Sequence, residues 1–405
     1  MSQGLGRTFW VMWAAATASF IGEGIQFGAL PLLAASLTRD PRLVSLTEVA
    51  AQSGWLLLGL VSGVLVDRWR RTSVMWIVDS IRAVVAGAFA FVVLADLHTI
   101  AILLLTGFML GLLSPFFDNA SSAVLPEIVD GNRLERANSY HQISITMGAT
   151  LVGPPLGAAL FVAMHGLPFA IYAVGFAVAA VLVWSVRTAV PAPKRAESSH
   201  LWRELADGVR YLWRHKLLRA LALLLLVVNL VGTGVVAILV LYVLEVLKLP
   251  QPGFGWLVAS YAVGGVIGAV AAPKLSERLA TFPSLLIASV LMCFGISVMG
   301  VWTAVVPVFG TVLVIGFGSS WWNVVTISLR QRLVPRDLLG RVTAVYRMIA
   351  FAAAPLGAVL AGWLAHQTTL RTPYVVLGLL QLVATIAFAP VIRRQLNALH
   401  PAPVS

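Results

Sequence analysis

Charged residues are scarce in this chain. Asp, Glu, Lys and Arg together make up only 11% of its 405 residues, against about 25% in an average soluble protein. So few charges cannot cover the surface of several soluble domains, which excludes a soluble enzyme of this length. They also exclude an intrinsically disordered chain, because disorder requires high charge and low hydrophobicity, whereas 59% of these residues are hydrophobic.

Acidic residues are scarcer than basic ones, and the formal net charge is +12. A charge of this sign and size raises nucleic acid as a partner. The basic residues, however, lie in short breaks between long apolar runs, which is the pattern of the cytoplasmic face of a membrane protein. We therefore expect a lipid bilayer as the partner of this chain, and no nucleic acid.

Several kinds of site have no sequence signature here. The single cysteine, Cys293, excludes an intrachain disulfide. There is no Gly-x-x-x-x-Gly-Lys-Ser/Thr loop, which argues against ATP as the energy source. The seven histidines are scattered, with His141 as a lone candidate for a role, and neither a Ser-His-Asp arrangement nor a carboxylate pair stands out. We expect no metal, no organic cofactor and no enzymatic activity.

Long apolar stretches dominate what is present. A helix needs about 20 mostly apolar residues to cross the hydrocarbon core of a bilayer, and we count twelve such stretches. The first is too long for a cleavable signal peptide. The sequence thus predicts an all-α membrane protein with twelve transmembrane helices, at residues 10–35, 46–66, 73–95, 99–121, 139–164, 167–186, 217–247, 253–273, 281–300, 302–329, 343–365 and 373–392.

The positions of the basic residues predict the orientation. Lys and Arg accumulate on the cytoplasmic side of membrane proteins. With the N-terminus inside, only four of the 28 basic residues fall in outer segments, namely Arg39, Arg42, Lys248 and Arg371. We therefore expect both termini in the cytoplasm, and a multi-pass protein of a bacterial-type plasma (inner) membrane.

The chain also repeats itself with an offset of about 205–210 residues. Residues 53–55 and 67–68 align with 263–265 and 277–278, and Leu134, Arg136 and Gly157 align with Leu339, Arg341 and Gly362. This predicts two pseudo-symmetric six-helix bundles, at 1–186 and 217–405, the second ending in a short cytoplasmic tail. Two parallel halves are typical of transporters with a central site.

The segment 187–216 is the one long break. It begins with a Pro-rich piece and continues with Leu201, Leu205, Val209 and Leu212 at helical spacing. An amphipathic helix at the membrane surface would produce this pattern. A solvated cytoplasmic linker is the alternative.

Two motifs connect the chain to a known family. Gly63-Val-Leu-Val-Asp67-Arg68-Trp-Arg70-Arg71 resembles the signature loop of the major facilitator superfamily. Gly153-Pro154-Pro155-Leu-Gly157-Ala158 resembles the antiporter motif of its drug:proton antiporter branch, which contains macrolide-efflux proteins and the enterobactin exporter. The resemblance covers the whole chain. The span 4 arginine of many proton antiporters has no counterpart, since Leu105 to Leu113 contains no basic residue.

The resemblance implies a cytoplasmic latch. Asp67 would meet the start of span 11 near Gly340 and Arg341, and Arg71 would reach Asp118. Gly59 and Gly63, four residues apart, would let two helices approach closely. Asp79 and Arg82, three apart near the inner end of span 3, are expected to pair as structural support. The alternative is that the loop arginines only fix the topology. The proposed latch comprises Gly63, Asp67, Arg68, Arg71, Asp118, Gly340 and Arg341.

Glu23 is the most specific candidate for a functional residue in this sequence. It lies about thirteen residues into the first span, where a charge costs about 2.5–3.5 kcal/mol on insertion scales. Gln26 and Phe27 follow on the same helix face. We hypothesise that Glu23 couples transport to protons or binds a cationic substrate. The alternative is a protonated or hydrogen-bonded structural Glu.

Polar residues in spans 7 and 10 are further candidates, by analogy with the family. Asn229, Thr233, Trp322 and Asn323 would line a central cavity. Buried polar groups need partners, so hydrogen bonding within or between helices is the alternative. In the antiporter motif, Gly153, Pro154 and Gly157 would allow a bend and close packing.

Taken together, these features predict a secondary transporter of major facilitator fold. We expect proton-coupled export of a hydrophobic or amphipathic small molecule, such as a drug, a macrolide-like compound or a siderophore, by alternating access. The proton gradient would be the driving force, and the protein a monomer. A uniporter or importer of the same fold is the alternative. A non-transporting membrane sensor is a more remote one, since it would need a soluble effector domain.

Overall fold

The computed structural model describes residues 5–186 and 201–399. Every regular element in this part of the chain is a helix. Eleven helices in it are long and apolar enough to cross a membrane. The remaining predicted stretch, 46–66, lies in α2 (Pro41–Arg68), whose 28 residues would extend about 42 Å at 1.5 Å per residue. The predicted all-α membrane fold is therefore confirmed.

The chain packs into two compact units. Unit 1 comprises Met1–Ser198 with Lys248–Ala259, and unit 2 comprises Ser199–Leu247 with Ser260–Ser405. The part of the predicted linker at 187–200 lies outside the described residues.

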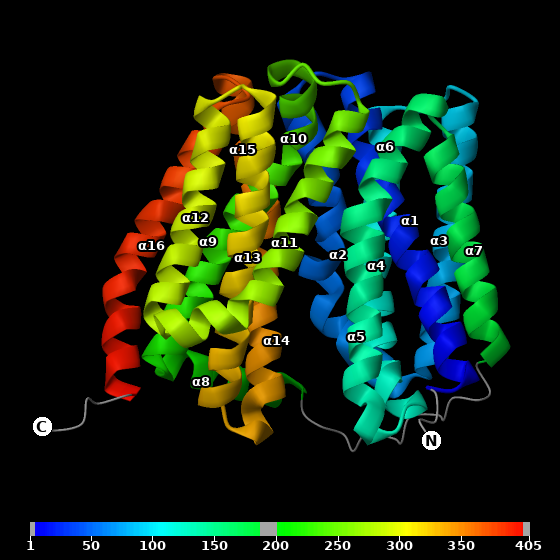
Figure 1. The fold of residues 1–405 in the computed structure, drawn as a ribbon. Coiled ribbons are helices and arrows are strands. Elements are labelled where there is room, and N and C mark those ends of the chain that lie inside the picture. The colour runs from blue at the N-terminus through cyan, green and yellow to red at the C-terminus, as the bar shows by residue number, and fades with distance from the viewer. Residues whose placement is uncertain (1–4, 187–200, 400–405) are drawn as a thin grey trace, which may run out of the picture. The chain divides into compact units, whose positions relative to one another are not determined.

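Unit 1 is built from the helices that follow the N-terminus. Helix α2 lies beside α4, and α3 beside α7 (Figure 1), while α1 packs against α6 and α7. The elements are α1 (Arg7–Leu37), α2, α3 (Arg71–Leu94), α4 (Ile100–Ile128), the turn η1 (Gly131–Arg133), α5 (Leu134–Ser144), the π-helical η2 (Ile145–Val152), α6 (Gly153–Ala163) and α7 (Leu167–Val186).

Unit 2 repeats this plan. Helix α12 lies against α13 and α16, and α9 lies against α15 and α16. The elements are α8 (Leu201–Arg214), α9 (Lys216–Ala237), α10 (Leu239–Leu241), the π-helical η3 (Tyr242–Val246), α12 (Thr281–Val301), α13 (Val305–Leu333), α14 (Arg336–Ala352), α15 (Ala354–Gln367) and α16 (Thr372–Leu399). Helix α11 (Pro252–Leu279) begins in unit 1 and continues in unit 2.

Local sequence explains where several helices begin. The Asp40 side chain accepts the N–H of Arg42, with Pro41 in the first helical position of α2. His215 caps α9 by accepting the N–H of Leu218 on Nδ1. Burial lowers the pKa of the His215 imidazole, which favours the neutral ring that can accept this bond.

Glycine contacts show the internal repeat in three dimensions. In unit 1, a Cβ on Gly54 would overlap the carbonyl oxygen of Gly111, so α2 and α4 touch backbone to backbone. In unit 2, a Cβ on Gly264 would overlap the carbonyl oxygen of Leu313, which brings α11 and α13 into the same contact. The predicted alignment of residue 54 with residue 264 therefore matches equivalent packing positions.

The repeat has a different register at the antiporter motif. Gly157 packs against the backbone of Ile25, and Gly357 packs in the same way against Leu230. The sequence agrees, since Pro155-Leu-Gly157-Ala158 recurs as Pro355-Leu-Gly357-Ala358. The alignment of Gly157 with Gly362 was therefore wrong, and Gly357 is the counterpart.

The predicted amphipathic helix is present as α8, which packs on α14 and α9. Leu212 is fully buried, and the Tyr211 hydroxyl donates a hydrogen bond to the carbonyl of Leu333 at 3.0 Å. Gly208 lies against the backbone of Arg341, whose side chain forms an ion pair with Asp207 at 3.6 Å. The solvated-linker alternative does not describe this segment.

Candidate functional site

Three charged side chains meet inside unit 1. Glu23 lies on α1, and Asp79 and Arg82 lie one turn apart on α3. The Nη1 atom of Arg82 is 3.0 Å from Oε1 of Glu23 and 3.7 Å from Oδ1 of Asp79. We call these three residues the charge cluster. The expected pairing of Asp79 with Arg82 is confirmed, and Glu23 joins it as a third member.

The cluster lies deep in the helical bundle. Arg82 is 1% exposed and Asp79 is fully buried, while the Glu23 side chain retains 23% exposure. Arg82 occupies the middle of α3, which spans Arg71–Leu94. The expectation that Arg82 lies near the inner end of span 3 was therefore wrong, because α3 begins at Arg71 and Arg82 follows three turns later.

Aromatic rings enclose the guanidinium of Arg82. Its Cζ lies 5.2 Å from the ring centre of Phe117 on α4 and 5.1 Å from that of Phe176 on α7. Such cation–π contacts stabilise a positive charge that has lost its water. The Ser19 hydroxyl on α1 donates a hydrogen bond to Oδ2 of Asp79 at 3.0 Å. Four helices thus contribute to one desolvated polar centre.

The charge cluster is not electrically balanced. Two carboxylates face one guanidinium, so the fully ionised cluster carries one net negative charge. Oε1 of Glu23, Oδ1 of Asp79 and all three guanidinium nitrogens make no hydrogen bond of good geometry within the described part of the chain. Buried charges are stable only when they are neutralised and hydrogen-bonded. A proton or a cationic substrate would supply the missing charge.

The basic partner of Glu23 was not predicted. Many proton antiporters carry an arginine on span 4, and this chain has none there. The structure supplies the basic partner of Glu23 from α3 instead, namely Arg82. The available signal was the depth of Arg82 within its span, since a basic residue far from both helix ends usually has an acidic partner. Phe117 on α4 occupies a position directly over this guanidinium.

The two predicted neighbours of Glu23 are held by other helices. Tyr172 on α7 donates a hydrogen bond from its hydroxyl to Oε1 of Gln26 at 2.6 Å. The ring of Phe27 stacks on Phe254, with centres 6.4 Å apart; residue 254 belongs to unit 1. These contacts set the rotation of α1 and with it the direction of Glu23.

Replacement of Tyr172 by Phe tests the first of these contacts. We expect a loss of about 1 kcal/mol in the free energy of unfolding, which is the usual net value of one hydrogen bond. Thermal unfolding in detergent would measure it. Phe176→Leu removes an aromatic ring beside Arg82 but leaves the hydrogen bond from Tyr172 to Gln26. A further Gln26→Leu change should therefore lower the stability of Phe176→Leu and leave that of Tyr172→Phe nearly unchanged.

The antiporter-motif residues pack directly against the helix that carries Glu23. A Cβ on Gly24 would meet the Cα of Gly153 at 2.8 Å, and a Cβ on Gly28 would overlap the carbonyl oxygen of Pro154. Gly157 lies against the backbone of Ile25. The expected close packing is confirmed, and its partner is the stretch of α1 that follows Glu23.

The structure gives several latch residues different partners. Arg71 forms an ion pair with Glu127 near the end of α4. Residues 118 and 127 are separated by about 13 Å along a helix, and the expected contact of Arg71 with Asp118 stays a prediction. Asp118 lies in electrostatic range of Arg82.

The structure describes the surroundings of most other latch residues. Gly63 lies near the Asn119 side chain, which donates to the hydroxyl of Ser62 at 2.9 Å. Arg68 and Gly340 are exposed, and Arg341 contacts Asp207. The side chain of Asp67 lies outside the described residues, so its contact with span 11 stays a prediction.

The predicted cavity residues of unit 2 divide into two groups. Trp322 is 3% exposed and packs in the apolar core of this unit, so its assignment to an open cavity was wrong. Asn229 donates to the carbonyl of Leu225 in its own helix, as the structural alternative expected. Asn323 is exposed and Thr233 is half-buried, and their contact with a substrate stays a prediction.

Comparison with known proteins decides the family. The model of the Major Facilitator Superfamily matches residues 12–353 and 221–403. The chain belongs to the major facilitator superfamily. It is thus a multi-pass membrane transporter, not an enzyme, as the two sequence motifs indicated.

Curated relatives of this transporter are named as exporters. It is 26% identical over 400 residues to the multidrug efflux pump Tap of Mycolicibacterium fortuitum, with 95% of both chains covered. It is 24% identical over 363 residues to the enterobactin exporter EntS of Escherichia coli O1:K1 / APEC, with 87% of this chain and 83% of the relative covered.

Solved structures show the same fold. The nucleoside transporter NupG superposes with a TM-score of 0.74 at 13% identity, covering 96% of this chain and all of that one. A bacterial homologue of the iron transporter ferroportin, in an inward-facing state, gives 0.72 at 19% identity and covers 97% of this chain and 99% of that one. At these identities the likeness concerns the fold alone.

Proposed function

We propose that this transporter exports a hydrophobic or amphipathic small molecule in exchange for protons, by alternating access. The observation that carries the proposal is the buried charge cluster of Glu23, Asp79 and Arg82, which has one carboxylate more than its guanidinium can neutralise. Proton uptake would neutralise the cluster in one conformation, and proton release would accompany the other. The partial exposure of Glu23 makes it the group that exchanges with substrate or solvent.

The names of the relatives support a drug or a siderophore as cargo. A multidrug efflux pump and an enterobactin exporter both match over most of this chain. The single surplus carboxylate favours neutral or cationic compounds over anionic siderophores. We further propose a bacterial-type inner membrane as the location, with both termini cytoplasmic, and a monomer that needs no cofactor.

The energetics of one proton are sufficient. A charge that crosses 100 mV releases about 2.3 kcal/mol, and about 1.4 kcal/mol corresponds to a tenfold concentration ratio. One proton per substrate would therefore sustain more than tenfold extrusion. A uniporter or importer of the same fold would not require the surplus carboxylate.

Glu23→Gln tests the proposal in liposomes that contain the purified protein and a pH dye. A panel of lipophilic cations, macrolides and siderophores is added under an imposed pH gradient. We expect substrate-triggered proton flux in the wild type and its loss in Glu23→Gln, because the amide cannot exchange a proton. Glu135→Gln, at an exposed position on α5, is the matched control and should transport normally.

The outcomes separate the alternatives. Proton flux that persists in Glu23→Gln would place the coupling group elsewhere. Substrate movement without any proton flux in the wild type would identify a uniporter and contradict the proposed coupling.

A further inference from the structure

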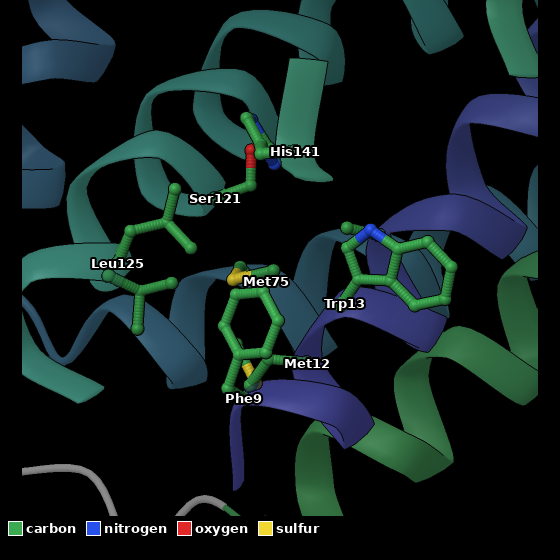
Figure 2. A pocket seen from close by; sticks show the side chains of 9 residues that line it. Phe9, Met12, Trp13, Met75, Ser121, Leu125 and His141 are labelled. Carbon is green, nitrogen blue, oxygen red and sulfur yellow. The ribbon is translucent and has the colours of Figure 1, made fainter. Parts of the chain in front are cut away.

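A small cavity lies at the end of unit 1 where α1, α3 and α5 begin and α4 ends. Its volume is about 10 Å³, which is room for about one water molecule. Figure 2 shows its lining, in which Met12 and Met75 supply apolar walls and His141 and Ser121 supply polar atoms. We call this space the His141 cavity.

The His141 cavity lies one helical turn from Asp79 of the charge cluster. On α1, the lining residue Ala16 is followed by Ser19, which binds Asp79, and then by Glu23 at the spacing of one helix face. On α3, the lining residue Met75 precedes Asp79 by four residues. One turn of an α-helix rises about 5.4 Å. On both α1 and α3, the residues that line the cavity are therefore about one turn from Asp79 or from the serine that binds it.

A third helix repeats this register. On α4, Ser121 lines the cavity, and Phe117, four residues earlier, covers the guanidinium of Arg82. The Ser121 hydroxyl donates to the carbonyl of Asp118 at 3.2 Å, and Asp118 lies in electrostatic range of Arg82. Three of the four helices around the charge cluster, α1, α3 and α4, therefore also line the cavity.

His141 brings a buried polar atom to this cavity without a protein partner. Its Nε2 atom is buried and makes no hydrogen bond in the described part of the chain. The imidazole packs edge-on against the ring of Phe20, 5.6 Å away, beside Ser19. On the cluster side, Oδ1 of Asp79 is likewise buried and without a hydrogen-bond partner. A buried polar atom of this kind usually binds ordered water.

We propose that His141 and Ser121 hold a water molecule in this cavity and relay protons between the inner aqueous side and Asp79. The relay rests on the proposed proton coupling. Nδ1 of the His141 imidazole takes one proton from solvent, which gives the imidazolium. The buried Nε2 then gives its own proton to the bound water, which passes one of its own to the Asp79 carboxylate. Only N–H and O–H bonds form and break, and one proton is transferred in total.

Other charged groups surround this path. The carboxylates nearest in register are Asp79 on α3 and Glu23 on α1, with Arg82 between them. The remaining titratable or charged residues on the elements packed around α5 are Arg7 on α1, Asp118 and Glu127 on α4, Arg133 on η1, and Glu135, Arg136 and Tyr140 on α5. Arg136 lies over the Tyr140 ring, with Cζ 5.8 Å from its centre.

His141→Ala with chemical rescue tests the relay. The purified variant is reconstituted in liposomes with a potassium diffusion potential as driving force and equal pH on both sides. Imidazole is added equally on both sides, so that it cannot create a pH gradient. We expect substrate-coupled proton flux to fall about tenfold or more, as is usual when a proton-transfer group is lost, and imidazole to restore most of it.

Substrate counterflow separates a relay from a structural role. Counterflow exchanges labelled for unlabelled substrate without net proton movement, and it should be unchanged in His141→Ala. His141→Gln keeps much of the side-chain volume but cannot carry the proton. Its substrate-coupled proton flux should therefore be as low as that of His141→Ala. His165→Ala, at an exposed position beyond α6, should neither lose flux nor respond to imidazole.

Three results would overturn the relay. One is normal proton flux in both His141 variants. The second is a loss that imidazole does not restore and that counterflow shares, since this indicates damaged structure. The third is a wild type that moves substrate without protons, in which case the proposed function fails as well; the first two leave that function standing.

Discussion

Replacing Arg82 with Met is expected to destabilise the protein by about 3–5 kcal/mol, which is the usual penalty for leaving the partner of a buried ion pair uncompensated. The guanidinium is 1% exposed and is the positive group that two buried carboxylates share. Met fills a similar volume, so the loss would come from charge rather than from a cavity. Thermal unfolding in detergent would measure it.

A triple variant isolates the electrostatic cause. Glu23→Gln, Asp79→Asn and Arg82→Met together remove every charge of the cluster. The triple variant, and the double variants that combine Arg82→Met with one neutralised carboxylate, should recover most of the stability that Arg82→Met alone loses. The triple variant should fold and yet show no substrate-triggered proton flux. Stability and coupling would thus be separated in one series.

An exposed arginine supplies the control for this series. Arg210 forms an ion pair with Asp207 at 3.6 Å, with 64% of its side chain exposed. Exposed pairs contribute about 0–1 kcal/mol, so Arg210→Met should leave the unfolding temperature nearly unchanged. An Arg82→Met variant as stable as Arg210→Met would contradict the buried ion-pair arrangement.

Alanine at Gly54 or at Gly264 is expected to destabilise the protein by about 1–3 kcal/mol each, the range found for overpacked interiors. At both positions the added methyl group would overlap a backbone carbonyl oxygen of the facing helix, Gly111 in unit 1 and Leu313 in unit 2. Backbone cannot move aside as a flexible side chain can, so the two helices must separate. The internal repeat predicts similar losses in the two units.

Gly310 on α13 provides the matched control, because nothing lies within 4 Å of a Cβ placed there. Gly310→Ala should be neutral or stabilise the helix by up to about 1 kcal/mol, the difference in helix propensity. Unfolding temperatures of the three variants in one detergent would decide the matter. A loss at Gly310 equal to that at Gly54 would show that the helix backbone, not the helix contact, causes the effect.

The amino-acid sequence by itself determined the fold class and the family of this transporter. Scarce charge and long apolar runs are sufficient for this, because the bilayer requires about 20 apolar residues in each crossing helix. The amphipathic helix at residues 201–214 and the glycine motif that permits close packing were also readable, since each is a pattern of residues close together in the chain.

The partners of the charged residues were decided only by the tertiary structure. The sequence placed Asp79 beside Arg82 because they are three residues apart, but Glu23 reaches Arg82 across 59 positions and Arg71 reaches Glu127 across 56. In a membrane helix, the lipid-facing side and the core-facing side are both apolar. The pattern within one span therefore does not show which face meets which neighbour, and helix packing alone assigns the partner.

The same reason explains Trp322 and Gly357. An aromatic residue beside polar ones in span 10 is equally compatible with a cavity and with the core, and packing places Trp322 in the core. Gly157 can be aligned with Gly362 or with Gly357, because both lie in apolar stretches. The contact of Gly357 with the backbone of Leu230 shows that Gly357 is the counterpart. Composition and length specify that these helices cross the membrane, whereas close contacts between them specify their rotation, and rotation is what brings one arginine between two carboxylates.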